Sequence, residues 1–218
     1  MNQTTSGTTL GLTIEKESPD EVIARRLSRE SNIRVRLLDA ERDPQLKEKI
    51  VTRYDFFNHM IETLAWHACL NVEVKANSMA YELTHVICED TGWTLGAAFL
   101  HLFQQRIARG VQGDGYSLGL MDEAACRCIV SFEGRARCAL HWSVPMPETV
   151  EGISSHHLVA FWEGLAYGGA ITIQLDILSG KDPHHTWEAA FRCLGKSLQM
   201  ALADCPWRAG TTPGVKGF

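Results

Sequence analysis

Hydrophobic and polar positions along the chain follow the periods of strands and helices in a regular order. Residues 33–38 (IRVRLL) alternate apolar and charged side chains, as a half-buried strand does. Residues 56–69 carry apolar side chains at helical spacing, residues 71–75 (NVEVK) alternate again, and residues 84–103 form a second predicted helix. The glycine-dense residues 110–119 (GVQGDGYSLG) predict a loop that ends this series.

The second part of the chain repeats this order of elements. Residues 128–132 and 137–142 flank a Glu133-Gly134 turn and predict a β-hairpin. A helix, a strand and a long helix are then expected at 155–167, 171–178 and 183–203. The pattern therefore favours an α+β fold in two halves, with helices covering one face of the sheet.

A sequence match between the halves supports an internal duplication. Residues 57–66 and 158–167 can be aligned position by position without a gap, so that His59 corresponds to Ala160. Each segment is followed by a strand and then by a helix that opens with histidine and carries a glutamate one turn later. These residues are His85 and Glu89 in the first half, and His184, His185 and Glu188 in the second.

The repeated histidine and glutamate pairs predict a metal site. Residues four apart lie on one face of a helix, so His85 with Glu89, or His184 with Glu188, could bind one cation. Imidazole and carboxylate ligands suit Mn, Fe, Co, Ni or Zn, whereas oxygen ligands alone would favour Mg or Ca. One such pair is more often an ordinary surface pair, but two at equivalent positions of a repeat favour a metal centre.

Composition narrows the class of protein. The chain has 218 residues, a net charge of −5 and an isoelectric point near 6.0, which argues against nucleic acid as a partner. No apolar run reaches the roughly 18–20 residues of a membrane span, and the N-terminus lacks a signal-peptide pattern, so we expect a cytoplasmic protein. The seven cysteines include no CxxC pair and predict reduced core thiols.

We expect a flexible tail over 1–20 and half-domains over 21–125 and 126–218.

Several motifs together resemble one known family, imidazoleglycerol-phosphate dehydratase, from about Arg26 to Phe218. They occur in the family's order: Phe56-Phe57-Asn58-His59-Met60, Cys88-Glu89-Asp90-Thr91-Gly92 with Leu95-Gly96, Met121-Asp122-Glu123-Ala124, Gly134-Arg135, and His184-His185-x-x-Glu188-Ala189-x-Phe191. The resemblance implies two homologous halves, each a four-stranded sheet with two helices, like domain 2 of ribosomal protein S5. It also implies a large cage-like homo-oligomer of about 24 subunits with metal sites at subunit contacts.

The resemblance further implies an activity and its residues. The family is a carbon–oxygen lyase (a hydro-lyase) of histidine biosynthesis that removes water from a small imidazole glycerol phosphate, using manganese (Mn²⁺) ions bridged by the substrate imidazolate. Carried over by position, the catalytic residues are Glu30 and Glu188, and the substrate-binding residues are Arg135, Arg192 and Lys216. The metal ligands would be His59, His85, Glu89, His184, His185 and Glu188.

Two departures from the family motifs remove metal-ligating histidines. Val86 and Ala160 stand where the family has histidine. By the symmetry of the repeat, one site should use His59, His184, Glu188 and position 86, and the other His85, Glu89, His185 and position 160. Each site keeps three of its four protein ligands, which is enough for a catalytic metal with open positions but should lower affinity.

Three nearby residues could compensate for these losses. His156 and His157 lie one helical turn before Ala160, so one of them could reach that vacated site; alternatively, both are ordinary exposed histidines at a helix start. Cys88 could offer a soft ligand beside Val86, although core packing is the favoured interpretation.

A third departure bears on the substrate. Gly113, followed by Asp114, replaces a substrate-binding arginine of the family, which removes a bidentate phosphate contact and adds charge of the wrong sign. Three functions therefore stay open: the family's dehydratase, a diverged metalloenzyme acting on another small molecule in specialised metabolism, and a non-catalytic homologue.

Overall fold

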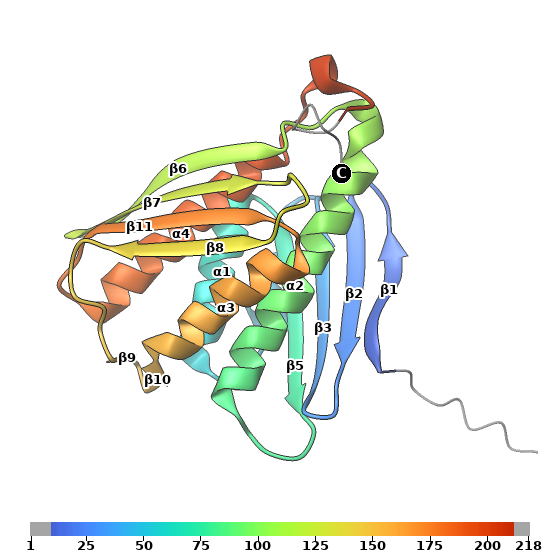
Figure 1. Cartoon of the computed structure of the whole chain (residues 1–218). Coiled ribbons are helices and arrows are strands. Elements are labelled where there is room, and N and C mark those ends of the chain that lie inside the picture. The colour runs from blue at the N-terminus through green and yellow to red at the C-terminus, as the bar shows by residue number, and fades with distance from the viewer. Residues whose placement is uncertain (1–9, 212–218) are drawn as a thin grey trace, which may run out of the picture.

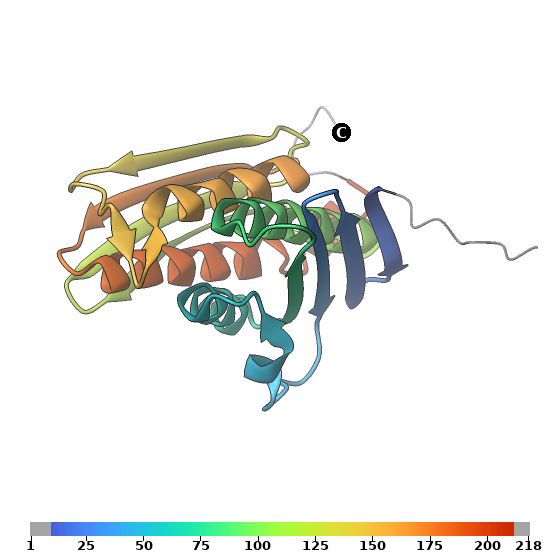
Figure 2. The ribbon, with the colours of Figure 1, turned by 90° about the horizontal axis from the view of Figure 1, so that it is seen from below.

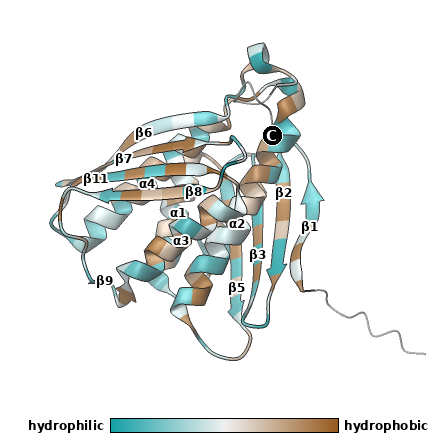
Figure 3. Cartoon of the chain, in the orientation of Figure 1, coloured by the Kyte–Doolittle hydropathy of each residue, from teal (hydrophilic) through white to brown (hydrophobic). Residues whose placement is uncertain are grey.

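Two β-sheets enclose a layer of helices in the computed structural model of the chain, which describes residues 10–211 (Figure 1). Figure 2, a view turned by 90°, shows the helices between the two sheets. Along β11, one of the inner strands, hydrophobic and hydrophilic residues alternate, as expected when one face of a sheet packs on helices (Figure 3).

The first half contains one five-stranded sheet and two helices. The strand order is β1-β2-β3-β5-β4, antiparallel except that β4 runs parallel to β5. The elements are β1 (Gly11–Glu17), β2 (Glu21–Leu27), β3 (Ser31–Leu38), a 3-10 turn (Leu46–Lys49), β4 (Ile50–Val51), α1 (Asp55–Ala68), β5 (Asn71–Ser78), α2 (Thr84–Arg106) and a 3-10 turn (Ile107–Arg109).

The second half contains a four-stranded sheet in the order β6-β7-β11-β8, with β8 parallel to β11. Its elements are β6 (Asp114–Met121), β7 (Ala124–Ser131), β8 (Arg137–Trp142), the short pair β9 (Thr149–Val150) and β10 (Ile153–Ser154), α3 (Ser155–Gly168), β11 (Thr172–Ser179), α4 (Pro183–Ala201) and a 3-10 turn (Pro206–Arg208).

The strand orders confirm the duplicated α+β fold. The series β2-β3-β5-β4 has the same order and the same strand directions as β6-β7-β11-β8. Helix α1 then corresponds to α3, and α2 to α4, because each pair occupies the same place in the chain order. The expected four strands and two helices per half are present, and β1 is added at the edge of the first sheet.

Two expectations about the strands are corrected. Residues 11–17, expected in the tail, form β1 because their backbone pairs with β2. Residues 128–132 and 137–142 form no hairpin, because β11 lies between β7 and β8 and bonds to both.

The glycine-dense segment expected as a loop is instead largely strand β6, which belongs to the second half although we expected that half to start at 126. Its glycines allow close packing on α4: a Cβ added at Gly115 would lie 2.1 Å from the carbonyl oxygen of Ser197, and one at Gly119 would lie 2.1 Å from that of Ala189.

Helices from different halves cross at very short range. A Cβ at Gly92 of α2 would lie 2.1 Å from the carbonyl oxygen of Phe161 in α3, and one at Gly168 would lie 1.9 Å from that of Trp93. Residue numbers rise in the same direction along both helices, so α2 and α3 run parallel to each other. Helices α1 and α4 also run parallel to each other, because His59 lies beside Glu188 and Leu64 lies beside Gly195.

Aromatic side chains from three helices join the halves in one core. Phe57 of α1 packs edge-on against Phe161 of α3, with ring centres 5.3 Å apart, and Phe161 stacks on Phe191 of α4 at 5.3 Å. All three side chains are fully buried. The two halves are therefore parts of one folded unit.

Candidate functional site

His59, His184 and Glu188 form a group that could hold a metal ion, and we call it the α1–α4 group. One ligand atom from each residue lies within 4.8 Å of the others. The Nε2 atoms of His59 and His184 lie 3.3 and 3.4 Å from Oε2 of Glu188. Two imidazoles and one carboxylate are the donor set of transition-metal sites, so the residues present fit such an ion.

Local sequence places these side chains. The Asp182 side chain caps α4 by accepting hydrogen bonds from the backbone N–H groups of His184 and His185, and Pro183 fixes the first helical residue. His184 and Glu188 are then one turn apart on the face toward α1. The ring of Phe56 packs edge-on against His184, with centres 5.1 Å apart, and limits its movement.

The carboxylate of Glu188 is buried and ionised. Arg192 donates to its Oε1 from Nη2 at 2.6 Å and from Nε at 3.0 Å, which leaves Oε2 facing the histidines. Burial raises the pKa of Glu188, but the hydrogen bonds and charges of Arg192 and His59 outweigh burial and lower it overall. A negative oxygen is thus held toward the two imidazoles.

A second set of residues occupies the equivalent place on the other helix pair. His85 Nε2 lies 3.4 Å from Oε2 of Glu89, and the His85 ring lies 5.6 Å from the ring of His157 on α3. We call these three residues the α2–α3 group. Nδ1 of His157 is buried and has no hydrogen-bond partner among the described residues. Burial lowers the pKa of His157, with a smaller contribution from the neighbouring histidines His85 and His156.

His185 belongs to neither group within one chain. Its Nδ1 lies 2.8 Å from Oε2 of Glu123, and this hydrogen bond raises the pKa of His185. The Glu123 carboxylate also accepts from the backbone N–H groups of Asp182 and Lys181. Together with the His185 contact these bonds lower the pKa of Glu123 to about 2. Glu123 thus fixes both the start of α4 and the orientation of His185.

Glu30, the expected acid–base residue, is exposed at the turn between β2 and β3. Its carbonyl oxygen accepts from the backbone N–H of Met79, and the adjacent Ser31 donates its hydroxyl to Asp90 of α2. Asp90 also forms an ion pair with Arg26. Asp90 follows Glu89 directly in sequence, so Glu30 lies at the same end of the molecule as His85 and Glu89. Sequence reasoning missed this role of Asp90, although the residue is part of the recognised Glu89-Asp90 motif.

The expected substrate-binding residues are dispersed in the chain. Arg135 is exposed between β7 and β8, Arg192 is paired with Glu188, and Lys216 lies outside the described residues. The loop with Gly113 lies beside the end of α4, where the Gly113 N–H donates to Ala201 O. Since His184 is at the start of α4, this loop is roughly 25 Å from the α1–α4 group.

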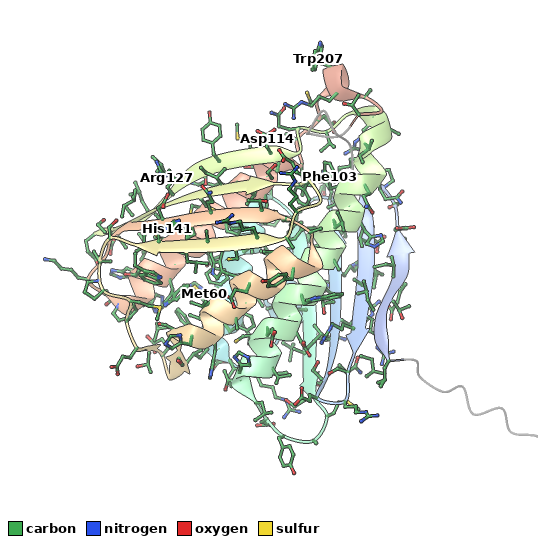
Figure 4. All side chains as sticks on the ribbon, in the orientation of Figure 1. Met60, Phe103, Asp114, Arg127, His141 and Trp207 are labelled. Carbon is green, nitrogen blue, oxygen red and sulfur yellow. The ribbon has the colours of Figure 1, made fainter. Side chains whose placement is uncertain are left out.

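The same loop carries Asp114, whose charge is compensated. Asp114 Oδ1 pairs with Nη1 of Arg208 at 3.0 Å. Figure 4 shows Asp114 at the end of the molecule that also carries Trp207. A guanidinium is therefore present at this loop, although it comes from Arg208 instead of position 113.

Cys88 is a core thiol. Its side chain is completely buried, and burial raises the pKa of the thiol to about 12. A protonated thiol facing the core is a poor metal ligand. The complete burial of its side chain favours core packing as the role of Cys88.

A family model described as imidazoleglycerol-phosphate dehydratase matches residues 52–198. The chain belongs to this family. Among its relatives is the imidazoleglycerol-phosphate dehydratase of Methylibium petroleiphilum, 33% identical over 194 residues that cover 88% of this chain and 94% of the relative. The dehydratase of Roseobacter denitrificans is 34% identical over 172 residues, covering 76% of this chain and 86% of the relative.

Solved dehydratase structures have the same fold. The enzyme of Pyrococcus furiosus, in complex with (S)-C348, superposes with a TM-score of 0.71 at 27% identity, covering 88% of this chain and 98% of that chain. The Staphylococcus aureus enzyme gives a TM-score of 0.71 at 20% identity and 85% coverage of this chain, which supports the fold alone. The expected family and fold are therefore confirmed. In the described part of the chain, no helix is long and apolar enough to cross a membrane.

Proposed function

We propose that the protein is a metal-dependent hydro-lyase that removes water from imidazoleglycerol phosphate in histidine biosynthesis. The observation that carries this proposal is the α1–α4 group: His59 is distant in sequence from His184 and Glu188, yet the three have ligand atoms within 4.8 Å of one another in a chain of the dehydratase family. Retention of this buried carboxylate and two imidazoles favours the family's activity over a non-catalytic homologue.

We assign Mn²⁺ as the metal, held by the α1–α4 group and by His85 with Glu89. When bound, such an ion supplies a Lewis acid that stabilises negative charge developing on the substrate imidazole. Glu188 contributes an ionised oxygen to this site, and Arg192 keeps that oxygen in position.

Proton movement falls to Glu30. Its exposed carboxyl group can take a carbon-bound proton from a substrate and deliver a proton to the departing hydroxyl, as the elimination of water requires. The Ser31–Asp90 hydrogen bond holds the Glu30 turn against α2, next to Glu89. Arg135, Arg192 and Lys216 are the cationic groups assigned to the substrate phosphate.

Completing these sites requires more than one subunit. His185 points about 100° away from His184 on α4 and is bound to Glu123, and the Gly113 loop is at the other end of α4. A homo-oligomer, with a cage of about 24 subunits as the expected form, would supply His185 of one chain to His85 and Glu89 of another. A biosynthetic role of this kind fits the cytoplasm.

Rescue of a histidine auxotroph that lacks the dehydratase is the direct test. Growth restored by the wild-type gene but not by Glu30→Gln supports the proposal. No growth with a folded, Mn²⁺-binding protein would point to the diverged metalloenzyme, and no growth with a folded, metal-free protein would point to a non-catalytic homologue. Dehydration of imidazoleglycerol phosphate by purified protein provides the same distinction in vitro.

A further inference from the structure

The α2–α3 group lacks the histidine that its counterpart has. In the repeat, His85 and Glu89 correspond to His184 and Glu188, and Ala160 corresponds to His59. We propose that His157 supplies the missing imidazole, so that the α2–α3 group binds a divalent transition-metal ion through His85, Glu89 and His157. This inference rests on the proposed function, because it concerns the metal content of the same active centre.

The helix crossing brings His157 to His85. The glycine contacts pair Gly92 with Phe161 and Gly164 with Glu89, so α2 and α3 run in parallel with an offset of about 70 to 75 residues. Extended to the start of α2, this register places residues 155 to 160 of α3, and so His157, beside His85. Position 157 is one turn before position 160 and shares its face, so its longer side chain reaches the site that Ala160 cannot.

One pair of histidine rings in each group has nearly the same separation. The ring centres of His85 and His157 are 5.6 Å apart, and those of His59 and His184 are 5.5 Å apart. Two imidazoles on one ion, each with a metal–nitrogen distance of about 2.1 Å, have ring centres roughly 5 Å apart. The ligand atoms of His85, Glu89 and His157 do not all lie within 4.8 Å of one another in the described structure, so the His157 ring must turn toward His85 for both nitrogens to reach one ion.

The carboxylate is placed alike in both groups. The separation between Nε2 and Oε2 is 3.4 Å for His85 and Glu89, and 3.4 Å for His184 and Glu188. The α2–α3 group thus has the same kinds of ligand as the α1–α4 group and the same spacing within its histidine–glutamate pair, with the remaining histidine one turn earlier on its helix.

His157 has an unused donor and His156 does not face the site. Nδ1 of His157 is buried without a hydrogen-bond partner in the described structure, which is costly for a polar atom unless a ligand uses the ring. His156 is exposed, and adjacent helical residues point about 100° apart. The two neighbours therefore give a matched pair for testing.

Metal titration of the purified oligomer tests the inference. Co²⁺ absorption and Mn²⁺ calorimetry should show two classes of site in the wild type. His157→Ala should weaken one class by at least about 10–100-fold, since even loss of an outer hydrogen bond to a ligand has that effect. His156→Ala should leave both classes unchanged, and His59→Ala should affect the other class only.

A reverse substitution provides a second readout. Ala160→His in the His157→Ala background should restore the weakened class, because position 160 is the repeat counterpart of His59. Unchanged stoichiometry and affinity in His157→Ala, with the His59→Ala class still lost, would overturn this inference and leave the proposed function standing. A wild-type protein that binds neither Co²⁺ nor Mn²⁺ would overturn both.

Discussion

At the residue scale, the two carboxylate oxygens of Glu188 have different partners, because Arg192 binds only one of them. Oε1 accepts two hydrogen bonds from the guanidinium, and Oε2 faces His59 and His184. The arginine keeps the carboxylate ionised and selects the rotamer that points at the histidines. A residue expected from the sequence to bind phosphate is thus also a positioning residue for the proposed metal ligand.

Glu188→Gln should lower Mn²⁺ affinity at the α1–α4 group by at least about 10–100-fold, because an amide oxygen carries no charge for the ion. Metal content after dialysis, measured by elemental analysis, is the readout. Glu163→Gln, on the exposed face of α3, is the control and should bind metal like the wild type. Full metal content in Glu188→Gln would show that this carboxylate is not a ligand.

The pair of Glu123 and His185 makes a prediction about pH. The hydrogen bond raises the pKa of His185 and, with two backbone N–H groups, lowers the pKa of Glu123 to about 2. The contribution of Glu123 to the free energy of unfolding is present above pH about 4.5 and is lost as pH falls through about 2. The contribution of His185 to the free energy of unfolding is present below the ordinary histidine pKa and is lost as pH rises through the raised pKa of His185.

Glu123→Gln should therefore lower the pKa of His185, because the charge that favours its protonated form is removed. Titration of the His185 ring protons by NMR measures this directly. Glu133→Gln, on an exposed turn, should leave the His185 titration unchanged. An unaltered His185 pKa in the Glu123 variant would mean that the contact is absent in solution.

Sequence periodicity could identify His85 with Glu89 and His184 with Glu188, because residues four apart on a helix are neighbours by construction. It could offer His156 or His157 for the site of His85 but could not decide between them, since that contact depends on the register between two helices that are distant in the chain. Repeat symmetry went one step further by joining His59 to the α4 pair, a grouping that the described atoms support.

At the element scale, four glycines fix the distance between α2 and α3. Gly92, Gly96, Gly164 and Gly168 each bring the other helix's backbone into the space of an absent Cβ. No side chain separates the helices at these points. Backbone contact therefore fixes the helical turn that carries His85 relative to the turn that carries His157.

Gly92→Ala should therefore lower the free energy of unfolding by about 1–3 kcal/mol or more, because its Cβ would lie 2.1 Å from the carbonyl oxygen of Phe161 and the helices must separate. Chemical denaturation gives the change, and metal titration should show weaker binding at the α2–α3 group only. Glu163→Ala, on the solvent side of α3, should change neither quantity appreciably. Unaltered stability in Gly92→Ala would contradict the close crossing.

The same close approach explains where sequence reasoning failed for elements. Gly110 to Gly119 has the composition of a loop, yet Gly115 and Gly119 are needed because β6 packs on the backbone of α4. The packing partner follows in sequence some 75 residues later, so local composition could not reveal it. Helix positions, by contrast, were predicted to within a few residues, since their hydrophobic period is set locally.

At the scale of the whole molecule, the proposed function divides each active centre between subunits. His85 with Glu89 lies on one helix pair, and His185 is bound to Glu123 at the start of α4. If sites are shared between subunits, two inactive variants can complement each other in a mixed oligomer.

Mixing His85→Ala with His185→Ala subunits during refolding should therefore restore about a quarter of the wild-type activity, since random pairing leaves that share of shared sites intact. Mixing His59→Ala with Glu188→Ala should restore none, because those residues belong to the same chain's group. Sedimentation should show large assemblies in both mixtures. Equal recovery in both, or in neither, would argue against shared sites of the proposed kind.

The duplication and the family could be read from the sequence because they depend on patterns inside one chain. Subunit arrangement could not, since a surface that binds a copy of itself has no periodic signature. The extra strand β1 shows the same limit: its exposed residues have no buried face, and its place is set by backbone pairing with β2.

The parallel crossing of the helices has an electrostatic consequence. Both groups lie within the first two turns of their helices, so two helix N-termini, each with a partial charge of about +0.5, adjoin each group. This field opposes a bare cation and favours an anion beside it. The metal ion and an anionic ligand should therefore each strengthen the binding of the other. The substrate-free protein should bind its metal ions less tightly than the protein with a bound phosphate-bearing substrate.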